Sequence, residues 1–384
     1  MALLARGQKR DKGGLRLRVT MLSKACVVGA YQTKLEAIAA HQDIELTVVV
    51  PPFWREGKHK LLLERAHVTG YRLIVAPTAF NGSFHLHFYP TLASILRRSK
   101  PDVCHIDEEP YNLATYLALR AARQVGARAL FFTWQNLLRH YPWPFRAMEQ
   151  YAYRHVAAAI AGNHDALQVL RAKGYAGPAQ VIPQFGVDAE IFCPAKDRPP
   201  GAPFTIGYAG RLVEQKGLHT LVEAAAGLAG EWQLSLCGTG PLKSELQDQL
   251  QDLHLAERIR FNDHVASGDM PRYLREMDVL VLPSLTRPNW KEQFGRVLIE
   301  AMSCGLPVIG SDSGEIPHVI GDADLIFPEG DAQALRSLLA TLLGDASLRR
   351  ALGTRGRARV LAHYTQTKIA EETVALYRAI QAQG

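Results

Sequence analysis

Short apolar runs alternate along the chain with longer stretches in which apolar residues recur every three or four positions. The short runs are typical of buried strands, and the longer stretches are typical of amphipathic helices. In the first half the pattern predicts strands at Leu17–Leu22, Glu45–Val50, Tyr71–Val75, Val103–Ile106, Ala129–Phe132 and Ala158–Ala161. It predicts helices near Thr33–His41, Leu92–Arg98, Leu113–Val125 and Phe145–Tyr153. Such alternation predicts an α/β fold, with parallel sheets covered by helices.

The second half repeats this alternation after a linker rich in proline and glycine at Asp197–Pro203. The expected strands are Phe204–Ala209, Trp232–Cys237, Ile259–Phe261 and Val279–Leu282. The expected helices are Gly217–Leu228, Leu242–Leu253, Met270–Met277 and Gly295–Cys304, followed by an amphipathic stretch at Thr365–Gln381. With 384 residues the chain is long enough for two domains, each with its own core.

Cysteine and histidine usage argues against a disulfide framework and against a metal centre. The five cysteines are scattered without paired spacing, so we interpret them as buried apolar residues in a reducing compartment. His85, His87 and His105 have no acidic or sulfur partner at ligand spacing. Polar residues at strand edges are the preferred interpretation of these histidines, and the sequence predicts no metal site.

Charge is unevenly distributed along the chain. Residues 1–200 hold 26 lysines and arginines against 15 acids, and residues 201–384 hold 18 against 22. This asymmetry indicates an anionic partner for the first half, although a basic solvated surface would give the same count. We see no secretory signal and no run of about 18 apolar residues that would span a bilayer. We expect a cytoplasmic protein, either free or peripheral on the inner face of the cell membrane.

Two acids, Glu292 and Glu300, flank the start of the helix expected at Gly295–Cys304. If most of the interval is helical, the two carboxylates lie about 12 Å apart. The amides of Phe294 and Gly295 lie between them, where free N–H groups and the positive end of the helix dipole bind anions. This order of groups is suited to sugar hydroxyls, a diphosphate and ribose hydroxyls held in line.

A second anion-binding loop is expected between the strand Phe204–Ala209 and the following helix. It contains Gly210, Arg211, Lys216 and Gly217. Both cationic side chains can reach a diphosphate and neutralise the charge that grows on a departing nucleotide.

Together with Asn262–Val265 and Pro283-Ser284, these segments resemble the donor domain of the retaining family-4 glycosyltransferases of GT-B fold. The resemblance covers Val181–Gly330 strongly and the first half weakly. It implies two Rossmann-like doubly wound domains that face a central cleft: residues 1–198 on the acceptor side, residues 199–365 on the donor side, and residues 366–384 as a helix that crosses back. It also implies metal-independent transfer from a nucleotide diphosphate sugar to a glycolipid, polysaccharide precursor or small metabolite, with retention.

The resemblance also assigns roles to residues. Glu292, Arg211 and Lys216 are expected to be catalytic. Donor contacts are expected from Gly29, Gln135, Gly210, Arg211, Lys216, Gly238, Val265, Glu292, Phe294, Gly295, Val297 and Glu300. Many members have a pair of glycines near the position of Gly29 and a histidine at the position of Gln135. Because glutamine cannot act as a base, a front-face mechanism is favoured, in which the leaving phosphate takes the acceptor proton; His140 and His164 remain alternative bases.

Glu108, Glu109 and Tyr111 follow a predicted strand and are expected near the acceptor, although the acids are equally suited to cap the next helix. Two stretches, Phe53–Lys60 and Arg139–Arg146, mix aromatic and basic residues. Such stretches favour an anionic membrane surface. Nucleic acid is not expected, since no binding module is recognisable. A GT-B nucleotide-sugar epimerase and a catalytically degenerate binding protein remain open alternatives.

Overall fold

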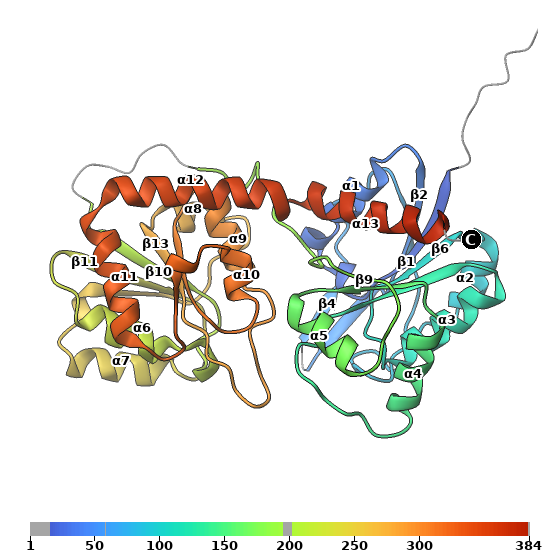
Figure 1. Ribbon diagram of the computed structural model, residues 1–384, viewed down its shortest axis with the longest axis horizontal. Helices are drawn as coiled ribbons and strands as arrows, with labels where there is room; N and C mark the ends of the chain where they lie inside the picture. The colour runs from blue at the N-terminus through green and yellow to red at the C-terminus, as the bar shows by residue number, and fades with distance from the viewer. Residues whose placement is uncertain (1–15, 58, 195–201, 383–384) are drawn as a thin grey trace, which may run out of the picture.

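The computed structural model describes residues 16–57, 59–194 and 202–382. The chain forms two lobes, each built around a parallel sheet with helices on both faces, as expected (Figure 1). The expected domain boundary at residues 198/199 lies outside the described residues. No helix within the described ranges is both long and apolar enough to cross a lipid bilayer.

The sheet of the first lobe has seven parallel strands in the order β5-β2-β1-β6-β7-β8-β9. Its strands are β1 (Leu17–Leu22), β2 (Ile44–Val50), β5 (Arg72–Val75), β6 (Val103–Ile106), β7 (Arg128–Thr133), β8 (Ala158–Ala161) and β9 (Ala179–Val181). Its helices are α1 (Thr33–Ala39), α2 (Leu92–Ser99), α3 (Leu113–Gln124), α4 (Phe145–His155) and α5 (His164–Ala172). The strand order reverses between β1 and β6, so a crevice opens at the carboxyl ends of these two strands.

The second lobe repeats this design with six strands in the order β12-β11-β10-β13-β14-β15. The strands are β10 (Phe204–Ala209), β11 (Trp232–Cys237), β12 (Ile259–Asn262), β13 (Val279–Leu282), β14 (Val308–Ser311) and β15 (Ile326–Phe327). The helices are α6 (Leu218–Ala226), α7 (Lys243–Asp252), α8 (Met270–Arg275), α9 (Arg296–Ser303), α10 (Ile316–Ile320), α11 (Ala332–Gly344) and α12 (Ala346–His363). The order reverses between β10 and β13, which carry the two loops predicted to bind anions.

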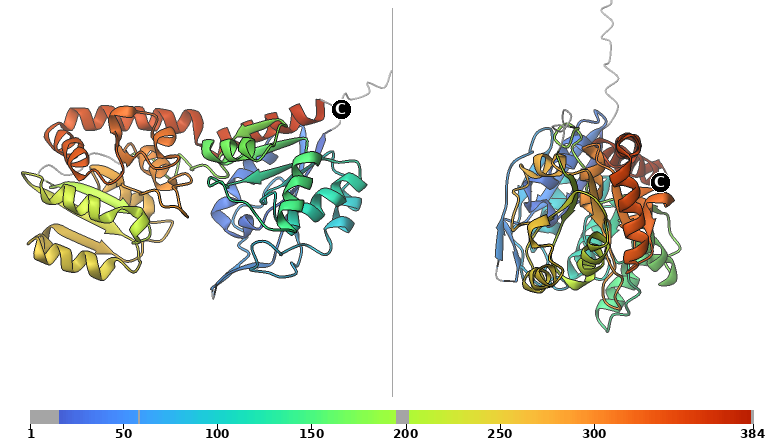
Figure 2. Two further views of the ribbon diagram at one scale, coloured as in Figure 1. Left: turned by 60° about the horizontal axis from the view of Figure 1, so that its bottom comes forward. Right: turned by 90° about the vertical axis from the view of Figure 1, so that its left-hand side faces the viewer.

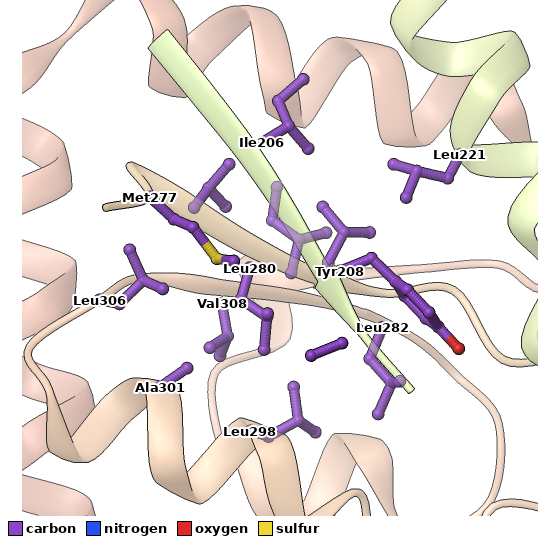
Figure 3. Close-up of a cluster of buried hydrophobic side chains, with 14 of the residues drawn as sticks. Ile206, Tyr208, Leu221, Met277, Leu280, Leu282, Leu298, Ala301, Leu306 and Val308 are labelled. Atoms are coloured by element: carbon purple, nitrogen blue, oxygen red, sulfur yellow. The ribbon is translucent and has the colours of Figure 1, made fainter. Parts of the chain in front are cut away.

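Apolar side chains from the centre of the second sheet pack against α9. Ile206, Leu280, Val308 and Leu298 are buried together (Figure 3). Tyr208 is fully buried in the same core, and its hydroxyl donates a hydrogen bond to the carbonyl of Arg211 at 2.8 Å. The core thus fixes the loop that follows β10.

The last helix, α13 (Gln366–Ala382), leaves the second lobe and packs against α1 and β6 of the first lobe (Figures 1 and 2). The hydroxyl of Tyr377 on α13 lies 2.6 Å from Nδ1 of the buried His105. Where the chain crosses between lobes, Val187 pairs with Thr365, so the outgoing and returning segments form a short two-stranded bridge. The segment that leaves the first lobe and the segment that returns to it are therefore joined by backbone pairing.

Each strand expected from an apolar run is present with its ends within one residue, but other elements were missed. Helix α5 has no counterpart in the predictions. The first aromatic-basic stretch forms an antiparallel hairpin of β3 (Phe53–Glu56) and β4 (His59–Leu62). In this hairpin Trp54 is buried, with Lys24 above its ring and His87 against its edge. The expectation that Trp54 meets a membrane is therefore wrong, because its indole is part of the lobe's interior.

Candidate active site

Glu292 is held at the carboxyl end of β13 by two donors from different segments. Nζ of Lys216 lies 2.5 Å from its Oε2, and the hydroxyl of Ser284 donates to the same oxygen at 2.8 Å. Lys216 also lies above the ring of Trp290, 5.0 Å from its centroid. The two loops predicted to bind the donor therefore meet in one ion pair, and Arg211 belongs to the same loop as Lys216.

Glycines allow the loops of the second lobe to approach this closely. Gly217 has a φ of +65°, and a Cβ added to it would lie 1.9 Å from the carbonyl oxygen of Pro283. Gly238 has a φ of +140°, and a Cβ there would lie 1.9 Å from the carbonyl oxygen of Gly210. The loops after β10, β11 and β13 are thus stacked without intervening side chains.

Glu300 has different neighbours from Glu292. Helix α9 begins at Arg296, one residue after the expected start, with Gly295 as its cap at a φ of +75°. Burial raises the pKa of Glu300, and Arg296, whose Nε donates to Oε1 at 2.7 Å, opposes that rise. Arg296 also reaches the hydroxyl of Tyr31 in the first lobe at 3.4 Å. Sequence reasoning missed Arg296, although its i,i+4 spacing to Glu300 is a usable signal.

The remaining predicted donor contacts lie around this helix start. Phe294 is buried and Val297 is half-buried. Burial raises the pKa of the Cys237 thiol at the end of β11, and the backbone N–H of the half-buried Val265 opposes that rise. The structure thus brings the second-lobe predictions to the carboxyl ends of β10 to β13.

Two first-lobe residues predicted to contact the donor already have partners. The amide of Gly29 donates to Oε2 of Glu64 at 2.6 Å. The side-chain oxygen of Gln135 accepts from Nζ of Lys173 at 3.1 Å. The buried Lys173 also pairs with Glu149 at 2.6 Å. A donor would have to share or displace these contacts.

The adjacent acids Glu108 and Glu109 lie in different environments. Glu108 is buried between Lys24 and His87; burial opposes ionisation, but these two neighbours lower its pKa to about 2. The carboxylate of Glu109 accepts from the hydroxyl of Thr133 at 2.6 Å and from the amide of Trp134 at 2.8 Å. Burial nevertheless raises the pKa of Glu109 to about 7.

A cavity of about 340 Å³ lies between the lobes, beside the segment that precedes Glu292. It is lined by aromatic, amide and charged side chains: Phe84, Glu109, Tyr111, Trp134, Gln135, Asn136, Leu137, Arg139, Tyr141, Asn289, Trp290, Lys291 and Gln293. Glu109 and Tyr111, but not Glu108, are among them. The expected acceptor role of Glu108 is therefore not supported by its position, since its carboxylate is enclosed by its two partners.

Hydrogen bonds hold the β13–α9 loop against the first lobe across this cavity. The side chain of Asn136 donates to the carbonyl of Lys291 at 3.1 Å, and Arg139 donates to that of Asn289 at 2.7 Å. Asn163, the N-cap of α5, donates to the carbonyl of Gln293 at 2.7 Å. Each first-lobe donor thus binds a backbone carbonyl within four residues of Glu292.

The sequence and the fold both match a known class of enzymes. Residues 193–359 match the family described as glycosyl transferases group 1, and residues 35–191 match glycosyltransferase family 4. The chain belongs to this family of GT-B glycosyltransferases, as the motifs around Glu292 and Glu300 indicated.

Among its relatives, a putative colanic acid biosynthesis glycosyltransferase of Salmonella typhimurium is 29% identical over 52% of this chain and 51% of its own length. The chain thus matches about half of that relative. A GDP-mannose-dependent alpha-(1-6)-phosphatidylinositol monomannoside mannosyltransferase of Mycolicibacterium smegmatis is 26% identical over 86% of this chain and 89% of its own length.

Solved structures show the same fold at lower identity. Sucrose-phosphate synthase from Thermosynechococcus elongatus is 20% identical, with a TM-score of 0.71 over 96% of this chain and all of that chain. HepE from Anabaena, solved in complex with UDP, is 19% identical, with a TM-score of 0.70 over 94% of this chain and all of that chain.

Proposed function

We propose that this protein transfers a hexose from a nucleotide diphosphate sugar to an acceptor hydroxyl, with retention at the anomeric carbon. The observation that carries the proposal is the Lys216–Glu292 pair just before α9, whose neighbours Trp290, Lys291 and Gln293 line a cavity rich in aromatic and amide groups. Cationic groups for a leaving diphosphate thus lie beside a space in which a second sugar can stack on aromatic rings.

In this proposal the second lobe binds the donor. Arg211 and Lys216 neutralise the charge that develops on the diphosphate, and the amides at Phe294 and Gly295 add the positive end of α9. Glu300 accepts hydrogen bonds from the ribose hydroxyls of the nucleotide, and Glu292 aligns the hexose that is transferred. Diphosphate binding would draw Lys216 partly away from Glu292, which frees that carboxylate to accept hydroxyl groups of the sugar.

The acceptor occupies the cavity between the lobes. Both oxygens of Glu109 retain a lone pair beyond those bound by Thr133 and Trp134, so the ionised carboxylate can accept a hydrogen bond from the acceptor hydroxyl. As the acceptor oxygen bonds to the anomeric carbon, the bond from that carbon to the phosphate oxygen breaks. The acceptor proton passes to the departing phosphate oxygen, and Glu109 serves to position the nucleophile.

A glycolipid at an anionic membrane surface is the acceptor that we favour. The mycobacterial relative is named for a phosphatidylinositol mannoside, and the first half of this chain has 26 basic residues against 15 acids. Trp143, in the aromatic-basic stretch that includes cavity residues Arg139 and Tyr141, is 83% exposed. Phe84 at the cavity is 44% exposed. An exposed aromatic rim beside the acceptor cavity suits a lipid headgroup presented at a membrane.

A screen of UDP-, GDP-, ADP- and dTDP-sugars against glycolipid and soluble acceptors tests this function. We expect nucleotide release that depends on the acceptor, with a glycoside whose anomeric configuration, read by proton NMR, matches that of the donor. Turnover of the nucleotide sugar without a glycoside would indicate an epimerase. Donor binding in titration calorimetry without turnover on any acceptor would indicate a binding protein.

A further inference from the structure

Three side chains that could bind a metal ion lie where the two lobes meet. His164 is the first residue of α5 in the first lobe, and Glu315 and His318 lie at the start of α10 in the second lobe. One possible ligand atom from each residue lies within 4.8 Å of the others. The cluster is therefore complete only when the lobes are in contact.

The carboxylate of this cluster is fixed in position. Glu315 is 4% exposed, and its oxygens accept from the backbone N–H of His164 at 3.0 Å and lie 2.7 Å from Nδ1 of the same residue. The carbonyl of His318 accepts from Arg359 at 2.6 Å and from the hydroxyl of Tyr364 at 3.2 Å. Backbone on both sides of the interface is thus held in place before any ligand binds.

The two imidazole rings remain at the surface. They are stacked, with centroids 4.1 Å apart and planes inclined by 26°, and both residues are exposed. A metal ion binds an imidazole nitrogen in the plane of the ring, so a shared ion requires at least one ring to turn out of the stack. The exposed position of both side chains permits that rotation.

From this geometry we infer that His164, Glu315 and His318 bind a zinc ion that links the two lobes. Two imidazoles and one carboxylate are a donor set that Zn²⁺ accepts, with water as the fourth ligand of a tetrahedral site. Mg²⁺ and Ca²⁺ prefer oxygen ligands and are poor candidates here. The transfer step proposed above draws on none of these three residues, so this ion is separate from that reaction.

The expected consequence is a restraint on the opening of the cleft. An ion that binds only when His164 lies against Glu315 and His318 stabilises the arrangement in which the lobes are in contact. The stabilisation grows with the ratio of the ion's concentration to its dissociation constant. The site lies close to the contact between Asn163 and Gln293 that holds the β13–α9 loop. Zinc should therefore favour the arrangement in which the donor loops face the first lobe.

The test is zinc binding to the full chain, freed of metal with a chelator and followed by titration calorimetry and thermal unfolding. We expect one zinc per chain and a rise in the unfolding temperature. His164→Gln and His318→Gln should each lower zinc affinity at least about 10-fold. His140→Gln, a change in an exposed histidine outside the cluster, is the matched control and should bind zinc like the unchanged protein.

Small-angle X-ray scattering separates a link between lobes from simple surface binding. If the metal-free protein samples open and closed arrangements of the lobes, zinc should shift its radius of gyration toward the smaller, closed value. The radius of gyration of His318→Gln should not change with zinc. Stoichiometric binding that survives both substitutions, or no binding, would overturn the inference. These outcomes are independent of the transfer assay, since His318→Gln should retain glycosyl transfer in metal-free buffer.

Discussion

At the scale of single residues, the two carboxylates that flank the start of α9 have distinct neighbours. Glu292 is paired with Lys216 and Ser284, whereas Glu300 is paired with Arg296. Lys216 belongs to the loop that we expect to clamp the diphosphate, so the charge at Glu292 is coupled to donor binding. The partner of Glu300 belongs to its own helix. This difference underlies separate predictions for the clamp and for the two acids.

Replacing Arg211 or Lys216 with alanine should lower turnover about 10²–10³-fold, the scale for loss of one preorganised group that stabilises developing charge. Steady-state rates at saturating donor provide the measurement. Lys368→Ala, which removes a half-exposed lysine paired with Glu371 on α13, should keep the full rate. Turnover like that of the unchanged enzyme in either clamp variant would remove these residues from the mechanism.

Glu300→Ala should mainly raise the donor KM, because ribose contacts are equal in the ground and transition states. Glu292→Ala should mainly lower kcat, since its contact aligns the reacting carbon. Initial rates over a range of donor concentrations distinguish the two effects. The role given to Glu292 fails if both changes alter KM alone.

The raised pKa of Glu109 leads to a prediction for the pH dependence of the reaction. Burial raises its pKa to about 7, so the carboxyl group is neutral below that pH and ionised above it. The ionised carboxylate accepts a hydrogen bond from the hydroxyl group of the acceptor. For this reason kcat/KM for the acceptor should rise as pH increases through about 7. Glu109→Gln should be slower at high pH and should lose this rise. A variant that retains the same acid limb would show that another group is responsible.

At the scale of elements, the site depends on close contact between loops that follow neighbouring strands. β10 and β13 adjoin in the sheet, and their loops meet where Gly217 contacts Pro283. The position of Lys216 relative to Glu292 follows from this contact. A substitution that separates the loops should therefore affect activity as well as stability.

Gly217→Ala should cost about 1–2 kcal/mol of unfolding free energy for the left-handed backbone alone, plus the cost of the clash with Pro283. Gly330→Ala is the matched control, since Gly330 has a φ of +78° with no atom within 4 Å of an added Cβ. Chemical denaturation of both variants isolates the cost of the clash, and Gly217→Ala should also lose turnover. Equal stability of the two variants would show that the loops can move apart freely.

At the scale of the whole molecule, the basic first lobe and the rim of the acceptor cavity define a surface suited to an anionic membrane. Basic groups near such a surface contribute about 1 kcal/mol each, and salt screens that contribution. An inserted aromatic ring adds a part that salt does not screen. The buried Trp54 is not available for this role, which leaves Trp143 as the expected anchor.

Sedimentation with vesicles should require anionic lipid and should weaken between low and physiological salt. Trp143→Ala should leave weaker binding that salt removes completely, because the unscreened part is lost. Leu361→Ala, a change in an exposed apolar residue on α12 of the second lobe, should bind like the unchanged protein. Absence of binding to anionic vesicles at low salt would favour a soluble acceptor.

The sequence by itself determined the parts of this protein that depend on local pattern. Apolar runs located six strands of the first sheet and four of the second, because a buried parallel strand leaves a short continuous signal; β9, β14 and β15 were not among the expected strands. The glycines, acids and cations around β10 and α9 predicted the second-lobe site, since their spacing along two adjoining loops is short-range information. The family resemblance came from the same segments.

Only the tertiary structure decided which of these groups meet. The partnership of Lys216 with Glu292 and the enclosure of Glu108 between Lys24 and His87 join residues 21 to 84 positions apart in the chain. The burial of Trp54 reversed an expectation based on composition, because an aromatic residue beside basic ones reads the same in a buried hairpin as at a membrane. The cluster of His164, Glu315 and His318 arises solely from the docking of two lobes, and contacts between lobes leave no periodic trace in the sequence.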